Sequence, residues 1–172
     1  MSGALLQVNM IIQGHFYFID DRYFLDFPDP NIQKNHEVIN GNTHDKPCFC
    51  GFQGDNHCIF WLIPISSRVD KYHRIANKKI SKYGKCDTIL FGEVLGREKA
   101  FLIQNMMPIT DDYIKNEYLD KNGVPVRLNG VFETKLINTA KDVLKKYKRG
   151  MNLIFPDIIT IENALLNSFI KE

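Results

Sequence analysis

Residues 59–85 read IFWLIPISSRVDKYHRIANKKISKYGK. The first part, 59–65, is apolar and predicts a buried strand. From Ser66 to Lys85, seven residues are Lys or Arg and one is acidic. This segment therefore carries +6, although the whole chain carries only +2. The basic residues recur every three or four positions, which predicts a helix with its cations along one face. A buried strand that leads into a basic helix is thus the centre of the expected fold.

Further strands are expected on both sides of this segment. Aromatic and β-branched residues predict strands over 15–19, 48–53, 58–64, 88–94 and 100–108. The second and third of these are joined by Gly54-Asp55-Asn56, and the last two by a turn over 96–99. We therefore expect two hairpins within one antiparallel sheet.

Loops and helices complete the expected order. Residues 28–47 contain prolines, glycine and asparagines with little periodicity, so we interpret them as one long loop. Helical spacing of apolar residues predicts helices over 134–149 and 160–171, the second one capped by Thr160. Strands first and helices last predict an α+β fold, in which a small curved sheet or barrel carries peripheral helices.

The composition is that of an ordinary globular protein. The chain has 172 residues, 44% of them hydrophobic and 24% charged, which fits a single domain over 1–172 with a substantial core. No apolar run approaches the roughly 20 residues that a membrane helix requires, and no signal peptide is evident. We expect a cytoplasmic protein.

The cysteines allow a metal site or a structural role. Cys48 and Cys50, with His44, His57 and Cys58 nearby, could hold zinc. However, two cysteines one residue apart do not match the usual spacing of structural zinc sites. On a strand, positions 48, 50 and 52 share one face, which favours buried core residues. We expect no metal and no cofactor.

The basic segment predicts a polyanion-binding surface, because several cations on one face favour binding of phosphates. A solvated helix face is the alternative, but such faces usually mix acids with bases. Another basic run, 135–149, has six bases and one acid. Two separate basic surfaces could hold a folded RNA. The residues expected to contact RNA are Arg22, Arg68, His73, Arg74, Lys78, Lys79, Lys82, Lys85, Lys145 and Lys148.

The hydroxyls and cations of this region fit the chemistry of RNA cleavage without a metal. Charge on the phosphorane must be neutralised, and one such donor contributes about 2.7–4 kcal/mol. Acid–base assistance contributes roughly 10²–10⁴ in rate. Lys71 could supply the cation, Ser66 and Ser67 could hold phosphate oxygens, and Tyr23 could offer a hydroxyl or a stacking ring.

Two other functions remain open from these residues. A serine–lysine hydrolase would use Ser67 and Lys71, although the lysine usually follows at the third position and here follows at the fourth. A non-catalytic RNA-binding protein would use the same basic surfaces without turnover.

Three motifs in order carry a family resemblance. They are FYFIDDRYFLDF over 16–27, FWLIPISSRVDKYH over 60–73 and QNMMPI over 104–109. The set resembles the endoribonuclease toxins of type III toxin–antitoxin systems, the ToxN and AbiQ family, and within it the CptN type. The resemblance implies that Ser67 is the family's key serine, Ser66 its preceding threonine and Tyr23 its tyrosine. It further implies that Lys71 is the counterpart of the catalytic lysine, with Arg68 as the alternative.

The resemblance also implies a fold and an activity. It implies a compact antiparallel β-barrel core related to MazF and Kid, with peripheral and C-terminal helices and no metal or cofactor. It implies RNA cleavage, often in adenine-rich sequence, to a 2′,3′-cyclic phosphate and a 5′-hydroxyl, and a role in phage defence. The implied partner is a small structured RNA such as a pseudoknot, processed from a repeated precursor, which blocks the site in closed RNA–protein complexes.

Overall fold

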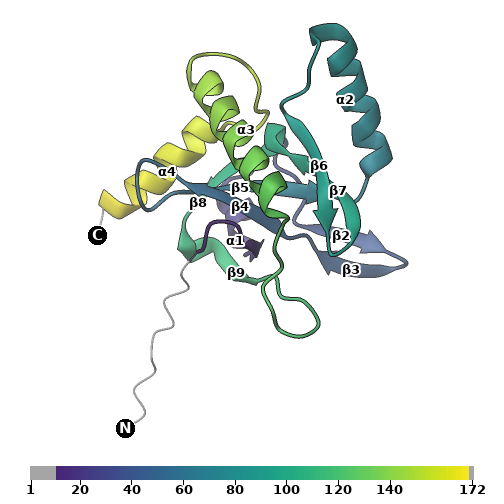
Figure 1. Ribbon diagram of the computed structural model, residues 1–172. Helices are drawn as coiled ribbons and strands as arrows, with labels where there is room; N and C mark the ends of the chain where they lie inside the picture. Colours follow the sequence, from purple (N-terminus) through teal and green to yellow (C-terminus); the bar gives the residue numbers. More distant parts are fainter. Residues whose placement is uncertain (1–10, 171–172) are drawn as a thin grey trace.

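The computed structural model describes residues 11–170 (Figure 1). Strands rich in aromatic and β-branched residues make up its main sheet, because such side chains pack well on a pleated surface. These strands are β1 Phe16–Ile19, β4 Cys48–Gln53, β5 Phe60–Ser66, β6 Ile89–Val94, β7 Arg97–Leu102, β8 Met107–Ile109 and β9 Ile114–Glu117. Neighbouring strands are antiparallel in the order β6-β7-β5-β4-β1-β9, and β8 pairs with β5. The expected strands over 15–19, 48–53 and 58–64 are confirmed.

The sheet is open within the described residues. In 11–170, the path of paired strands begins at β6 and ends at β9, and no pairing joins these two edges. The α+β class is therefore confirmed, whereas the closed barrel is not. Strand β5 lies at the centre, since its first half pairs with β8 and its last residues pair with β7.

The expected loop over 28–47 contains a second, small sheet, so that prediction was wrong. Strands β2 His36–Ile39 and β3 Asn42–Asp45 form a hairpin. Its turn residues Asn40 and Gly41 both have positive φ, at 50° and 79°. Asparagine followed by glycine is the strongest short signal for such a turn, because both tolerate the left-handed conformation. The prolines and polar residues around it hid this signal.

The hairpin of β6 and β7 turns earlier than expected. Its turn is Leu95-Gly96, with φ of 51° and 76°, so residues 97–99 belong to β7 rather than to the turn. The expected strand over 100–108 is also interrupted, because the short 3₁₀ helix η1 Ile103–Asn105 separates β7 from β8. This break moves the chain from one half of β5 to the other.

Two polar residues of η1 form hydrogen bonds with segments that are distant in sequence. The backbone N–H of Gln104 donates to the carbonyl of Thr88 at 3.0 Å, and its carbonyl accepts from the N–H of Phe155 at 2.8 Å. The side-chain amide of Asn105 donates to the carbonyl of Asn31 at 2.9 Å. The QNMMPI motif therefore joins three connecting segments to the core.

The helices are α1 Arg22–Asp26, α2 Val69–Tyr83, α3 Gly130–Lys148 and α4 Ile158–Ile170, and the 3₁₀ helix η2 spans Asp111–Tyr113. The helix expected in the basic segment is confirmed as α2, and Gly84 ends it with φ of 82°. The helix expected to begin at Thr160 begins at Ile158, and its end at 171 lies outside the described residues. Asp157 is the capping residue, since its carboxylate accepts from the N–H and the hydroxyl of Thr160.

The core lies between the sheet and the helices. Its largest fully buried side chains include Trp61, Tyr23, Phe16, Phe49 and Phe101. Helix α2 packs on β6 and β7, α3 on β4, and α4 on β8. In Figure 1, α2 stands apart from α3 and α4. Within residues 11–170, no helix is long and apolar enough to cross a membrane.

Candidate functional site

The two serines at the end of β5 face different surroundings. Ser66 is buried, and its hydroxyl oxygen accepts a hydrogen bond of 3.2 Å from the N–H of Arg68. This short-range bond shapes the turn that leads from β5 into α2. Ser67 is exposed and precedes Arg68, the N-cap residue of that helix. The structure therefore gives Ser66 a local structural contact and leaves the hydroxyl of Ser67 at the surface.

A lysine from the neighbouring strand reaches Ser67. The ammonium group of Lys99 donates a hydrogen bond of 2.6 Å to the Ser67 hydroxyl. Strand pairing explains this contact, since Ser66 lies opposite Ala100 in the register of β5 and β7. Because the strands are antiparallel, Ser67, which follows Ser66, then lies opposite Lys99, which precedes Ala100.

The side chains of β7 point alternately to the two faces of the sheet, and this separates its basic residues from its acidic one. Arg97 and Lys99 line the same groove, whereas the carboxylate of Glu98 contacts the imidazole of His73 on α2. Successive residues of a strand point to opposite faces, so this separation follows from the strand. Sequence reasoning missed Lys99 because it placed 96–99 in a turn. The alternating Arg-Glu-Lys pattern was the available signal.

The Ser67–Lys99 pair lines a surface groove of about 380 Å³. Its walls come from β7, from the end of β6, from the β2–β3 hairpin and from the residues just after β9. We call it the Ser67 groove. It is lined by Glu37, Ile39, His44, Asp45, Lys46, Pro47, Ile65, Ser67, Val94, Leu95, Arg97, Lys99 and Tyr118.

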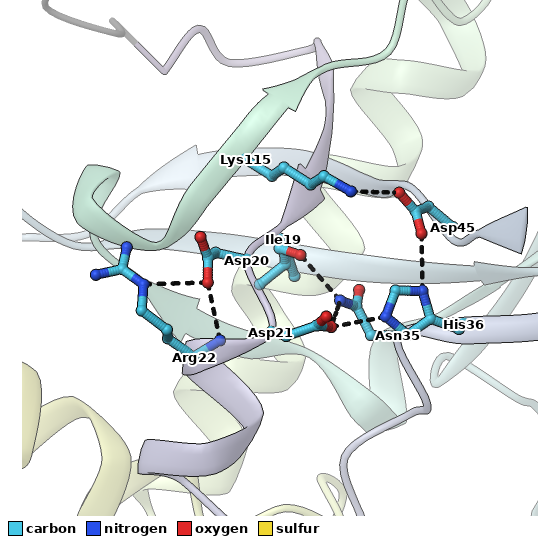
Figure 2. A network of polar contacts seen from close by, with 8 residues as sticks. All are labelled: Ile19, Asp20, Asp21, Arg22, Asn35, His36, Asp45 and Lys115. Atoms are coloured by element: carbon cyan, nitrogen blue, oxygen red, sulfur yellow. Dashed lines mark hydrogen bonds and ion pairs between the residues drawn. The ribbon is translucent and has the colours of Figure 1, made fainter.

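A polar network fastens the hairpin wall of the groove to the sheet (Figure 2). The imidazole of His36 contacts two carboxylates, with Nε2 2.7 Å from Asp21 and Nδ1 2.7 Å from Asp45. Asp45 also accepts from Lys115 on β9 at 2.8 Å, and Asp21 accepts from Asn35 at 2.8 Å. Figure 2 shows these side chains meeting between α1, β9 and the hairpin. The network holds the hairpin strands next to the sheet.

The groups in this network shift one another's pKa values. Hydrogen bonds from His36 to Asp21 and Asp45 raise the pKa of the imidazole. Lys115, followed by His36, lowers the pKa of Asp45. Asn35 and His36 lower the pKa of Asp21. The arrangement therefore favours a protonated imidazole between two ionised carboxylates.

Comparison with known proteins bears on the fold. No family model matches the chain, and no curated protein is significantly similar to it in sequence. Among solved structures, the chain is similar to AbiQ, described as a lactococcal anti-phage endoribonuclease belonging to the type III toxin–antitoxin system. The TM-score is 0.63, and the match covers 92% of this chain and 98% of AbiQ, with 16% sequence identity. The chain has the fold of AbiQ. The resemblance carried by the three motifs is thereby confirmed for the fold.

On this AbiQ fold, Lys71 and Arg68 are both exposed at the start of α2. The ammonium of Lys71 is 5.2 Å from the centroid of the Tyr72 ring, on the exposed side of α2. Arg68 is exposed at the start of the helix. The cation that hydrogen-bonds to Ser67 in this structure belongs to Lys99, which the expected cluster of Ser66, Ser67 and Lys71 did not include.

Tyr23 belongs to the core of the AbiQ fold rather than to the groove. Its side chain is fully buried, and its hydroxyl donates to the carbonyl of Pro108 at 2.7 Å. Its ring packs against Phe24, Phe27 and Tyr113. Burial raises the pKa of Tyr23 well above its ordinary value. In this structure, neither the ring nor the hydroxyl of Tyr23 is exposed, in contrast to the role expected for it at an RNA-binding surface.

The α2 residues expected to contact RNA divide into two groups. Two of them make specific contacts within the protein: His73 stacks on Phe91 with ring centroids 3.7 Å apart, and Lys79 donates to Thr88 at 2.9 Å and to Gln104 at 2.8 Å. The others are exposed along the helix or just after it, and these are Arg74, Lys78, Lys82 and Lys85.

The remaining expected contacts lie elsewhere on the surface. Arg22 contacts the carboxylate of Asp20 at 3.1 Å and the carbonyl of Asp112 at 2.8 Å, beside α1. Lys148 lies 3.3 Å from a carboxylate oxygen of Glu162, and Lys145 is exposed on α3. The structure does not bring these three residues to the Ser67 groove, as its lining shows.

The core position expected for Cys48 and Cys50 is confirmed. Both side chains are buried in β4, and burial raises the pKa of each thiol to about 12. Cys58 is exposed in the turn before β5. Among residues 11–170, no group of three His, Cys, Asp or Glu side chains is arranged to hold a metal ion.

Proposed function

We propose that residues 1–172 form an endoribonuclease domain that cleaves RNA without a metal ion at the Ser67 groove. The observation that carries this proposal is the 2.6 Å hydrogen bond from Lys99 to Ser67, both of which line the groove. The AbiQ fold supports it, since AbiQ is described as an endoribonuclease. The exposed cations of α2, which starts beside Ser67, also support it, because RNA binding depends on phosphate contacts.

In the proposed reaction, the ribose 2′-oxygen attacks the adjacent phosphorus and the bond to the 5′-oxygen breaks. The 2′-hydroxyl gives up its proton to a base, and the 5′-oxygen receives one from an acid. The products are a 2′,3′-cyclic phosphate and a 5′-hydroxyl. His44 lines the groove and is the candidate for one of these two proton transfers, because an imidazole can act as a general base or a general acid.

Charge on the phosphorane is neutralised by Lys99 and Arg97. Both residues line the same groove, so a phosphate placed there would be close to two cationic side chains. The hydroxyl of Ser67 accepts from Lys99 and can donate its own proton to a phosphate oxygen. Ser66 shapes the turn that presents Ser67, and is a positioning residue. We thus assign to Lys99 the role that the sequence suggested for Lys71.

The proposal includes an RNA partner. We propose that the chain is the toxin of a type III toxin–antitoxin system, that it processes a repeat-derived structured RNA, and that this RNA then occupies the groove in a closed RNA–protein complex. Two exposed basic surfaces, on α2 and on α3, would let one folded RNA contact the protein twice.

Cleavage of an end-labelled, adenine-rich RNA by the purified, RNA-free protein in excess EDTA tests this function. We expect discrete products that end in a 2′,3′-cyclic phosphate, and their loss in Ser67→Ala. Intact RNA that is nevertheless retained on a native gel would contradict the enzyme and support the non-catalytic RNA-binding alternative. Cleavage that requires an added divalent ion would overturn the metal-free mechanism.

A further inference from the structure

A second hollow lies at the other end of α2, between that helix, α3 and the connection from α3 to α4. Its volume is about 430 Å³. We call it the α2–α3 cleft. This size falls within the range of sites that hold small molecules, so it can accept one nucleotide.

Large apolar side chains remain exposed in the α2–α3 cleft. Tyr83 is 67% exposed, Met151 51% and Phe155 47%. They come from the last turn of α2 and from the α3–α4 connection, so the cleft has apolar groups on two of its walls. Single exposed apolar residues are common, but a cluster of them in one hollow indicates a binding site.

Cations surround this apolar surface. Lys79, Lys85 and Lys146 line the cleft, against one acidic residue, Asp87. The ammonium of Lys79 lies 5.7 Å from the centroid of the Phe155 ring. Lys85 contacts Asp87 at 3.0 Å, and Lys146 contacts Asp142 at 2.8 Å, with all these groups partly solvent-exposed. Aromatic surface enclosed by an excess of positive charge suits a ligand that is both flat and anionic.

We infer that the α2–α3 cleft binds one unpaired nucleotide of an RNA, with the base against Phe155 and Tyr83 and the phosphate near Lys85 and Lys146. This inference rests on the proposed function, which supplies the RNA. Single-stranded nucleic acid is typically bound by aromatic rings that stack on bases and by cations that follow the backbone. A base within a duplex offers no free face, so the nucleotide must be unpaired.

Helix α2 connects this cleft to the Ser67 groove. Ser67 precedes its first turn and Tyr83 ends its last turn, and its 15 residues span about 22 Å. Arg74, Lys78 and Lys82 are exposed between the two ends. Figure 1 shows the helix running away from the β2–β3 hairpin, which forms the groove wall. A single RNA strand along α2 could therefore occupy both sites, whereas a short oligonucleotide could occupy only one.

Binding of a long RNA and cleavage of a short RNA test the two sites independently. The full chain would be mixed with a long single-stranded RNA that carries 2′-fluoro groups, which cannot act as the attacking nucleophile. We expect Tyr83→Ala and Phe155→Ala each to weaken binding by roughly 5- to 150-fold, the range for loss of one stacking contact. The matched control is Phe169→Ala, because this ring is 40% exposed on α4 and does not line the cleft. Cleavage of a short ribo-oligonucleotide should be unchanged in all three variants.

Photo-crosslinking uses the wild-type protein, so its result does not depend on whether the alanine variants fold. A long RNA with 4-thiouridine should crosslink to peptides that contain Tyr83 or residues 151–155. Unchanged binding by Tyr83→Ala and Phe155→Ala, or crosslinks that avoid these peptides, would overturn the inference even if cleavage is observed. Crosslinks at the cleft without cleavage would instead uphold it and count against the proposed catalytic activity.

Discussion

Lys99 and Ser67 are 32 residues apart in sequence, and their side chains are joined by a hydrogen bond of 2.6 Å. The contact exists because β5 and β7 are neighbours in the sheet with Ser66 opposite Ala100. Ser67 itself stands between the end of β5 and the start of α2. The position of Lys99 is thus set by strand β7 of the sheet, and the position of Ser67 by the turn from β5 into α2.

The identity of the catalytic cation can be tested with two lysine variants. We expect Lys99→Ala to lower the rate of RNA cleavage by about 10²–10³, because one preorganised charge donor is removed. Lys71→Ala should change the rate only a few-fold, since this side chain lies over Tyr72 on the exposed side of α2. The measurement is single-turnover cleavage at saturating protein.

Lys99→Arg provides the control for charge. It keeps a cation beside Ser67 and should recover part of the lost rate, although the planar guanidinium differs in geometry from an ammonium. If Lys71→Ala lost as much activity as Lys99→Ala, the assignment of the cation to Lys99 would be wrong.

Tyr23→Phe should reduce stability and leave catalysis intact. The substitution removes the donor to the Pro108 carbonyl, and an unsatisfied buried acceptor costs about 1–3 kcal/mol. Urea unfolding would measure this loss. Tyr83→Phe is the matched control, because that side chain is 67% exposed and should change the free energy of unfolding little. A large drop in cleavage rate by folded Tyr23→Phe protein would instead show that the hydroxyl takes part in the reaction.

The His36 network should make stability depend on pH. The pKa of His36 is raised by Asp21 and Asp45, so its contribution is fully present below the unfolded value of about 6.5 and is lost as pH rises through the raised pKa. The pKa values of Asp21 and Asp45 are lowered, so their contribution is present above about 3.9 and is lost as pH falls through the lowered pKa.

We therefore expect His36→Gln to destabilise the protein most between roughly pH 4 and pH 6.5 and progressively less in alkaline buffer. The measurement is the free energy of unfolding of both proteins across this range. His57→Gln is the control, because His57 is exposed in the turn before β5. A difference that grew toward alkaline pH would contradict the raised pKa of His36.

The exposed face of α2 should determine the salt dependence of RNA binding. For single strands, each neutralised phosphate contributes about 0.7 to the slope of log affinity against log salt concentration. Lys78→Gln should reduce the slope by about this amount, whereas Lys121→Gln, in an exposed turn away from α2, should leave it unchanged. Equal slopes for both variants and the wild type would contradict contact between Lys78 on α2 and an RNA phosphate. Titrations with 2′-fluoro RNA at several salt concentrations would decide this.

Local patterns in the sequence were sufficient for most elements of the fold. The apolar run before Ser66 and the basic spacing after it gave β5 and α2, since both depend on residues close in sequence. The hairpin of β2 and β3 was missed although Asn40-Gly41 signalled its turn. The turn of β6 and β7 was misplaced because Leu95 is a rare residue for a left-handed conformation.

The sequence by itself determined the α+β class, the pair of hydroxyls at the end of a buried strand and the basic face of α2. The tertiary structure decided which cation meets the Ser67 hydroxyl and whether Tyr23 faces solvent. Spacing along the chain suggested Lys71, but antiparallel pairing of β5 with β7 brings Lys99 to Ser67. Packing likewise buries Tyr23 against Pro108, far along the chain. Both contacts arise from strand register and core packing, which bring together residues that no local pattern connects.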